Sequence, residues 1–274
     1  INLMTQYSSI STKKTLSVID LAKMKQQGEK IACLTAYDAS FSALLDGVGI
    51  DVILVGDSLG MVVQGRDSTL PVTIDDMVYH TRCVAGARKR ALVMADLPFM
   101  SYSTTQSAAK NSARLMREGN AQMVKLEGFR PEIIHFLVEQ GIPVCGHLGL
   151  LPQSINQLGN YRVQGRESGD AAKIFEDSKK LEQSGISMLI LECVPAVLAK
   201  QISGQLKVPV IGIGAGADCD GQVLVLYDML DVGVGKRPVF SKNFIKDTGT
   251  IEGAVKAYLD DVKNSHFPAL EHCF

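Results

Sequence analysis

The sequence has no large excess of charge of one sign and no long apolar run. Its 28 basic and 29 acidic residues give a net charge of −1 at pH 7, whereas a nucleic-acid-binding surface usually shows as a basic patch and a high isoelectric point. No apolar stretch approaches the roughly 18 residues that a membrane span requires. We therefore expect neither a nucleic-acid partner nor a membrane-spanning segment.

The six cysteines lack the spacing of a zinc, redox or disulfide framework. None form a CxxC pair, and most lie inside apolar runs, where cysteine behaves as a small hydrophobe. We therefore expect reduced thiols and a cytoplasmic protein. Residues 1–14 are polar, rich in Ser and Thr, and contain no long apolar segment. We expect them to form a flexible N-terminal arm rather than a signal peptide.

The rest of the chain alternates short apolar runs with longer segments of helical period. The runs cover residues 30–37, 51–58, 90–98, 123–128, 143–149, 188–194, 208–214 and 222–230, the last being ambiguous between strand and helix. Runs that are apolar on both faces are typical of parallel strands covered by helices. Eight such units predict a (β/α)8 TIM barrel that occupies residues 15–274 as a single catalytic domain.

An extra helix is expected before the barrel, at residues 16–27, with Thr15 as its cap and Gly28 as its stop. An open, doubly wound sheet is the alternative to a barrel. It is less favoured because no GxGxxG motif follows the first apolar run.

Ionisable residues stand at the carboxyl ends of most predicted strands. In a parallel barrel these ends face one mouth, where catalytic groups gather. The residues concerned are Asp38, Asp57, Asp96, Lys125, Glu127, His147 and Glu192. A helix cap or an ion pair would explain any one of them alone, but their repetition indicates a functional site.

Asp57 and Asp96 end consecutive apolar runs, VILVGD and ALVMAD. Two carboxylates brought close together repel, so they need a cation or one of them takes up a proton. Ligands that are all oxygen favour Mg²⁺ or a similar hard cation. Helix capping by each aspartate is the simpler alternative.

The other strand-end residues suggest acid–base roles. Lys125 and Glu127 are two apart on one strand and therefore share a face, so Lys125 would neutralise a substrate carboxylate or oxyanion and Glu127 would support the metal. Glu192 follows the apolar residues LIL, a setting that suits a general base. His147 would donate to a substrate oxygen. Ion pairing or a structural role remains the alternative for each residue.

A metal, a lysine and a base in one mouth together suit proton abstraction beside a carbonyl. A metal that chelates the keto and carboxylate oxygens of a 2-oxo acid would acidify the adjacent C–H bond. The base would then form an enolate that attacks an electrophile.

Several long segments allow comparison with known families. From about residue 30 onward they read LTAYDASFSALLD, VGDSLGMVVQGRDSTLPVTIDDMVYHT, ADLPFMSY, VKLEG, GHLGLLPQS, YRVQGR, LECVP, IGIGAGADCDGQVLVLYDML and HFPALEHCF. Together they resemble the ketopantoate hydroxymethyltransferase family. The resemblance implies a barrel of the phosphoenolpyruvate/pyruvate superfamily that transfers a hydroxymethyl group from 5,10-methylenetetrahydrofolate to 3-methyl-2-oxobutanoate, leaving tetrahydrofolate and 2-dehydropantoate. It also implies Mg²⁺ and a homo-oligomer, often a decamer.

The resemblance also implies roles for residues of this sequence. Positions matching Asp57 and Asp96 bind Mg²⁺ and substrate, and the position of Glu127 binds the metal. Ser58 and Lys125 match substrate-binding positions. The position of Glu192 is that of the proton acceptor.

Three positions depart from the family pattern, namely Leu151, Asn160 and Arg66. They fall in predicted loops and bear on folate affinity and assembly.

A second enzyme hypothesis is a lyase or phosphonate mutase of the same superfamily, with Cys145 as an acid. A third is a barrel without catalytic activity.

Overall fold

The computed structural model describes residues 15–159, 162–233 and 235–274. Eight parallel strands form a closed barrel in which each strand pairs with the next and β8 pairs with β1. The strands are β1 (Ile31–Thr35), β2 (Val52–Val55), β3 (Leu92–Asp96), β4 (Met123–Glu127), β5 (Val144–Gly149), β6 (Met188–Glu192), β7 (Val210–Ile213) and β8 (Gly221–Leu224). The predicted TIM barrel is confirmed.

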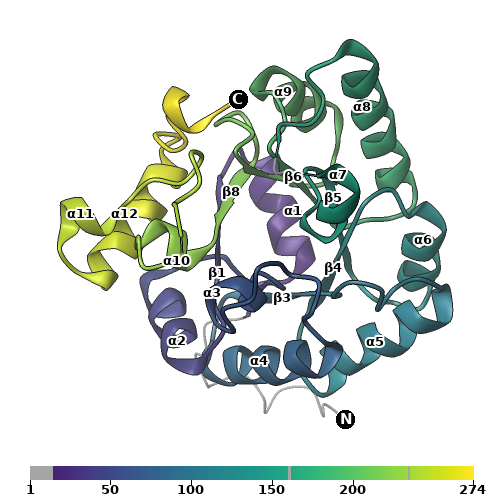
Figure 1. Cartoon of the computed structure of the whole chain (residues 1–274), viewed down its shortest axis with the longest axis horizontal. Helices are drawn as coiled ribbons and strands as arrows, with labels where there is room; N and C mark the ends of the chain where they lie inside the picture. The colour runs from purple at the N-terminus through teal and green to yellow at the C-terminus, as the bar shows by residue number, and fades with distance from the viewer. Residues whose placement is uncertain (1–14, 160–161, 234) are drawn as a thin grey trace, which may run out of the picture.

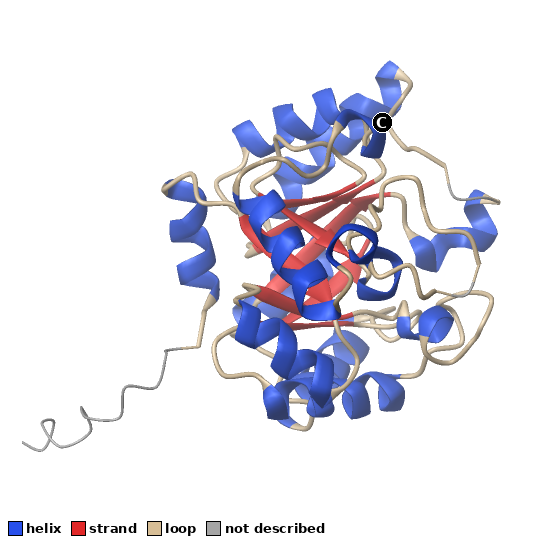
Figure 2. Cartoon of the chain, turned by 90° about the vertical axis from the view of Figure 1, so that its left-hand side faces the viewer, coloured by secondary structure: helices blue, strands red, loops and turns tan. Residues whose placement is uncertain are grey.

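Helices surround the strands (Figures 1 and 2). The longer ones are α1 (Val18–Gln26), α2 (Ala39–Val48), α4 (Ile74–Ala87), α5 (Thr105–Arg117), α6 (Pro131–Glu139), α8 (Ser168–Gln183), α9 (Ala196–Gln205) and α12 (Ile251–Lys263). The short ones are α3 (Leu59–Val62), α7 (Ile155–Leu158), α10 (Leu226–Met229) and α11 (Ile245–Thr248), with 3-10 turns at Pro152–Ser154 and Leu270–His272. No described helix has the length and apolarity that a membrane span needs.

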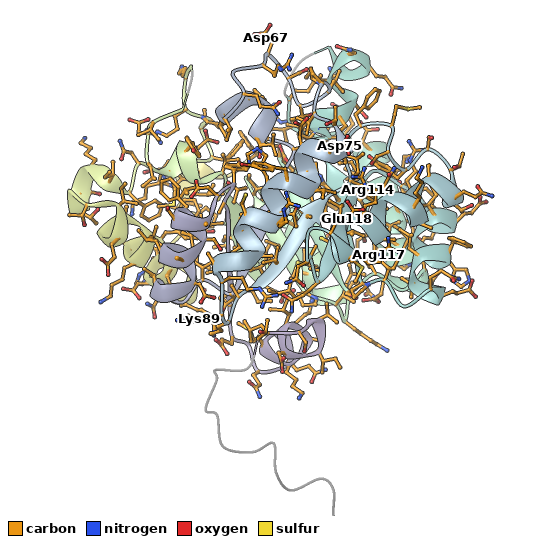
Figure 3. The ribbon with its side chains drawn as sticks, turned by 90° about the horizontal axis from the view of Figure 1, so that it is seen from below. Asp67, Asp75, Lys89, Arg114, Arg117 and Glu118 are labelled. Atoms are coloured by element: carbon orange, nitrogen blue, oxygen red, sulfur yellow. The ribbon has the colours of Figure 1, made fainter. Side chains whose placement is uncertain are left out.

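The strand interiors are apolar because both faces of each strand are covered. All residues of β1, β2, β3 and β4 are buried, as expected for parallel strands between a packed barrel interior and a helical layer. The surface of the helical ring carries the charges. Figure 3 shows Arg114 of α5, which pairs with Asp75 of α4 at 2.7 Å and with Glu118 at 3.1 Å.

The extra N-terminal helix is confirmed as α1, but its cap is not the expected residue. The Ser17 hydroxyl accepts a hydrogen bond from the Asp20 backbone, and the Asp20 carboxylate accepts one in return, which makes a capping box. Thr15 instead donates to the Lys89 carbonyl. The expected arm, residues 1–14, lies outside the described residues.

The ambiguous run at residues 222–230 contains both kinds of structure. Strand β8 ends at Leu224, and α10 begins at Leu226. Strands β7 and β8 are joined through residues 214–220 without a helix, so this one connection departs from the regular strand–helix alternation.

The last α-helix, α12, contacts β1 and β8, the two strands whose pairing closes the barrel. The buried Tyr258 hydroxyl lies 2.8 Å from the Cys33 carbonyl of β1 and 2.9 Å from the Gln222 carbonyl of β8. Its ring packs edge-on against Phe244 and Phe267. One side chain thereby connects the first strand, the last strand and the final helix.

We predict that Tyr258→Phe lowers the free energy of unfolding by about 1 kcal/mol, because the ring packing stays while a buried hydrogen bond is lost. Urea denaturation measures the change, with Tyr79→Phe as the control because Tyr79 is 56% exposed. Equal midpoints for the two variants would contradict the role of Tyr258 in closing the barrel.

Candidate active site

The carboxyl ends of β2, β3 and β4 bring three charged side chains together. The Lys125 ammonium lies 2.8 Å from Asp96 Oδ1, and both side chains are almost completely buried. The Asp57 backbone N–H donates to Asp96 Oδ2 over 3.1 Å. This proximity follows from the strand register, which pairs Asp96 with Lys125.

A glycine after β2 leaves room for the Ser58 hydroxyl beside Asp96. A Cβ at Gly56 would lie 2.8 Å from Ser58 Oγ and 3.6 Å from Asp96 Oδ2. The Ser58 hydroxyl is also hydrogen-bonded to the Tyr37 hydroxyl over 2.9 Å. The VGDS sequence therefore places Asp57 and Ser58 at the mouth with no side chain intervening.

Gln153, in the 3-10 turn after β5, connects two of the carboxylates. Its side-chain amide donates to Asp57 Oδ2 over 2.8 Å and to the Leu97 carbonyl over 3.0 Å. Its backbone N–H donates to Glu127 Oε2 over 3.0 Å. Its amide oxygen accepts from the Tyr102 hydroxyl over 2.6 Å. Gln153 thus holds Asp57 and Glu127 in a fixed relation.

His147 lies between two carboxylates. Its Nδ1 is 3.6 Å from Glu127 Oε1 and its Nε2 is 3.3 Å from Glu192 Oε2. Neither contact has hydrogen-bond geometry, so both are charge contacts. Burial lowers the pKa of His147, but the two carboxylates more than offset this effect and raise the pKa to about 9.

The buried ionisable groups of the site change one another's pKa values. Burial, followed by the charges of Asp96 and Glu127, raises the pKa of Asp57. Burial opposes protonation of Lys125, but the surrounding carboxylates raise its pKa and keep it charged. Burial also disfavours ionised Glu127, but His147 and Lys125 outweigh it and lower the pKa. Three carboxyl groups thus face two cations, Lys125 and His147, and this imbalance adds to the effect of burial in raising the pKa of Asp57.

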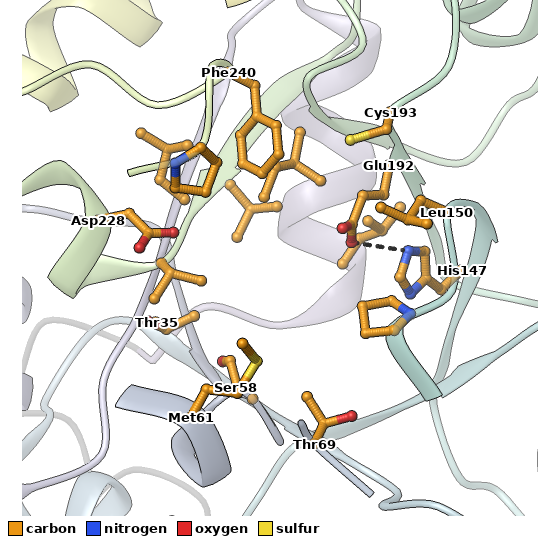
Figure 4. A pocket seen from close by; sticks show the side chains of 18 of the residues that line it. Thr35, Ser58, Met61, Thr69, His147, Leu150, Glu192, Cys193, Asp228 and Phe240 are labelled. Carbon is orange, nitrogen blue, oxygen red and sulfur yellow. Dashed lines mark ion pairs between the residues drawn. The ribbon is translucent and has the colours of Figure 1, made fainter. Parts of the chain in front are cut away.

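A cavity of about 720 Å³ opens above this cluster. Six of the predicted mouth residues line it together with Ser58, namely Asp57, Asp96, Lys125, Glu127, His147 and Glu192. The seventh, Asp38, does not line the cavity and instead caps α2 by accepting from the Phe41 backbone N–H. Figure 4 shows Glu192 and Asp228 pointing into the cavity from opposite sides, with Phe240 above the space between them. Burial, and then the charge of Glu192, raise the pKa of Asp228 to about 6, against the effect of Arg237.

The backbone turns sharply where Glu192 enters the cavity. Cys193 adopts a positive φ of 47°, a conformation that is uncommon for residues other than glycine. Gly149 on β5 lies against this turn, because a Cβ there would be 2.2 Å from the Glu192 carbonyl. The turn that follows Glu192 is therefore packed closely against the end of β5.

The predicted metal ligands are of the chemical type that a hard cation prefers, but they are not arranged as a preformed metal site. Among the described residues, no group of three His, Cys, Asp or Glu side chains is arranged to hold a metal ion. Asp57 and Asp96 are bonded instead to Gln153 and Lys125. The donors are nevertheless all carboxylate oxygens, which is what Mg²⁺ prefers.

Sequence reasoning missed Gln153, Tyr102 and Asp228. Gln153 lies within the GHLGLLPQS segment, but an uncharged residue outside a strand gave no chemical signal. Asp228 was hidden in the ambiguous run at 222–230. Of the three departures, Leu151 approaches the position of a Cβ at Gly128, Arg66 is exposed, and Asn160 lies outside the described residues.

Cys145, the acid of the lyase hypothesis, does not reach the cavity. It is fully buried, and its thiol points to the Gly146 carbonyl at 3.4 Å. Burial raises its pKa, which keeps the thiol protonated. The lyase hypothesis required a cysteine acid in the cavity, and Cys145 is not in that position.

A closed parallel barrel with acids, a lysine and a histidine around one open mouth defines an enzyme of the TIM-barrel class. The sequence profile described as ketopantoate hydroxymethyltransferase matches residues 15–270. The chain therefore belongs to the ketopantoate hydroxymethyltransferase family, and the hypothesis of a barrel without catalytic activity is excluded.

Individual relatives agree with this assignment. A 3-methyl-2-oxobutanoate hydroxymethyltransferase from Nitrosococcus oceani is 58% identical over 258 residues, 93% of this chain and 98% of that protein. Another, from Alkalilimnicola ehrlichii, is 56% identical over 265 residues, 96% of each chain.

Solved structures share the fold at low identity. A phosphoenolpyruvate phosphomutase from Streptomyces platensis has a TM-score of 0.60 and 12% identity, covering 79% of this chain and 83% of its own. A phosphonopyruvate hydrolase, solved with oxalate and Mg²⁺, has a TM-score of 0.57 and 11% identity, covering 94% and 93%. These similarities support the barrel fold alone.

We predict that His147 in metal-free protein titrates near pH 9, because two carboxylates favour its charged form. It should therefore be an imidazolium at neutral pH and lose its proton only as the pH rises through about 9. Histidine ring NMR measures the midpoint. Glu192→Gln should lower it by removing one flanking charge, with surface His135 as the internal reference. A midpoint unchanged by this substitution would contradict the assignment.

Proposed function

We propose that residues 15–274 form one catalytic domain that transfers a hydroxymethyl group from 5,10-methylenetetrahydrofolate to 3-methyl-2-oxobutanoate, giving 2-dehydropantoate for pantothenate synthesis. The main support for this proposal is that one cavity is lined by Glu192 together with Asp57, Asp96, Lys125 and Glu127. The names of the close relatives support the reaction.

In this proposal the floor of the cavity binds the 2-oxo acid. Lys125 and the Ser58 hydroxyl face its carboxylate and keto oxygens, and protonated His147 donates to a substrate oxygen. Asp57, Asp96 and Glu127 would hold Mg²⁺. A divalent cation bound there supplies electron withdrawal from the carbonyl, which makes the neighbouring C3–H bond more acidic.

Glu192 is the proposed proton acceptor. It enters the cavity beside His147 and is partly accessible, with 15% of its side chain exposed. It removes the C3 proton, and C3 then forms a C–C bond to the donor methylene. Water supplies the hydroxyl oxygen. The two C–N bonds of the methylene break, and both nitrogens gain protons to leave tetrahydrofolate.

The apolar barrel interior beneath the charged floor limits the access of bulk water to the carbanion. Leu54, Ile190, Ile213 and Leu224 line the cavity alongside the charged groups. The cysteine pattern leads us to propose that the enzyme works in the cytoplasm. From the family resemblance we propose that it is a homo-oligomer, as family members are, often as decamers.

We predict that Glu192→Gln abolishes exchange of the C3 proton of 3-methyl-2-oxobutanoate in heavy water, because the amide cannot accept the proton. Proton NMR follows the exchange, and calorimetry checks that the acid still binds. Glu139→Gln on the outer end of α6 is the control and should exchange normally. Retained exchange in Glu192→Gln would remove Glu192 as the base.

We predict that Asp57→Ala abolishes Mg²⁺-dependent binding of the 2-oxo acid. Gln153→Ala should weaken Mg²⁺ binding by about 10- to 100-fold, because residues that orient metal ligands have effects of this size. Titration calorimetry measures both, with Gln201→Ala on exposed α9 as the control. Parental Mg²⁺ affinity in Asp57→Ala would refute the metal site, and parental affinity in Gln153→Ala would refute the positioning role of Gln153.

A further inference from the structure

Tyr37 is a buried phenol to which the proposed chemistry gives no role. It follows β1, and only 2% of its surface is exposed. Its hydroxyl is hydrogen-bonded to the Ser58 hydroxyl over 2.9 Å. Ser58 lines the cavity (Figure 4), whereas Tyr37 is not part of that lining among the described residues. Tyr37 therefore lies behind a hydroxyl that faces the substrate, within reach of controlling its direction.

A second hydroxyl and a backbone N–H lie on the other side of Tyr37. Thr35, the last residue of β1, is buried, and its side chain is a further hydrogen-bond partner of the Tyr37 hydroxyl. The Leu226 backbone N–H, at the start of α10, donates to Thr35 Oγ1 over 3.0 Å. A backbone N–H only donates, so the Thr35 oxygen accepts there and its own hydrogen remains available for Tyr37.

Packing on two sides fixes the position of the phenol. Its ring lies against the ring of Tyr227, with the centroids 5.8 Å apart. Its backbone carbonyl accepts a hydrogen bond from His80 Nδ1 of α4 over 2.7 Å. The neighbouring Ala36 N–H donates to the Leu54 carbonyl of β2 over 3.0 Å. The hydroxyl therefore meets Ser58 from an anchored ring.

The chemistry of the substrate decides the direction of these hydrogen bonds. The keto and carboxylate oxygens of a 2-oxo acid can only accept, so Ser58 must donate its single hydrogen to them. The Ser58 oxygen is then left to accept from Tyr37. Burial raises the pKa of Tyr37, although its bonds with Ser58 and Thr35 lower it, and the protonated phenol keeps the hydrogen that this bond needs.

We propose that Tyr37 is a positioning residue for the reaction, because its hydroxyl donates to Ser58 and thereby directs the Ser58 hydrogen toward the bound 2-oxo acid. This inference rests on the proposed function, which supplies the acceptor oxygens. The bonds then run in one direction, from Leu226 through Thr35 and Tyr37 to Ser58 and the substrate. A hydroxyl that accepts a hydrogen bond becomes a stronger donor, so Tyr37 also strengthens the contact of Ser58 with the substrate.

The test is a double-mutant cycle measured by calorimetric titration of the Mg²⁺-loaded protein with 3-methyl-2-oxobutanoate. Tyr37→Phe keeps the ring and removes the donor, and it should weaken binding about three- to tenfold, the effect of one neutral hydrogen bond. Ser58→Ala should weaken binding at least as much. Adding Tyr37→Phe to Ser58→Ala should cause no further loss, because the two residues then act as one unit.

Tyr227→Phe is the matched control. It removes a phenol hydroxyl from the ring that packs against Tyr37, but Tyr227 is not among the cavity-lining residues of the described chain. This variant should bind the 2-oxo acid as the parent does. Thermal unfolding followed by circular dichroism checks that all variants remain folded at the temperature of the titration.

Two results would overturn the inference. Parental affinity in Tyr37→Phe would show that Ser58 does not need the phenol, and an equal loss in the presence and absence of Ser58 would show that Tyr37 acts through packing alone. The same cycle with oxalate, whose oxygens also accept, separates this inference from the proposed function. A parent that binds oxalate but not 3-methyl-2-oxobutanoate would refute the proposed substrate, while the oxalate cycle still decides the role of Tyr37.

Discussion

The ion pair between Lys125 and Asp96 is the interaction on which the site depends. Three carboxylates lie within the buried end of the barrel, and removing each from water is costly unless an opposite charge is near. Strand register supplies that charge, because Lys125 stands directly opposite Asp96 on the neighbouring strand. The ammonium also lowers the pKa of Asp57 and of Glu127, so its loss would favour protonation of both carboxyl groups.

Buried charged groups have different partners at the two ends of the barrel. At the amino end, Asp51 accepts from Arg90, Lys263 and the Ala32 backbone, and Asp220 pairs with Lys25. These carboxylates are saturated by protein partners and stabilise the fold. At the carboxyl end, the ring nitrogens of His147 lack hydrogen bonds. Polar groups with unused bonding capacity are gathered at the end where a substrate can supply the missing partners.

Sequence reasoning predicted what strand periodicity determines. The barrel followed from the alternation of apolar runs and helical segments, and Asp57, Asp96 and Glu192 were found because each ends such a run. Gln153 was missed because its importance comes from a loop conformation that brings it 2.8 Å from Asp57, across 96 residues of sequence.

Gln153 also has a consequence for the order in which the site can form. Its side-chain amide donates to Asp57, which follows β2, and its backbone N–H donates to Glu127 at the end of β4. These bonds join segments that are far apart in the sequence. They can therefore form only after β2, β4 and the turn after β5 have come together, so the acidic floor is a product of the assembled barrel and not of any one strand–helix unit.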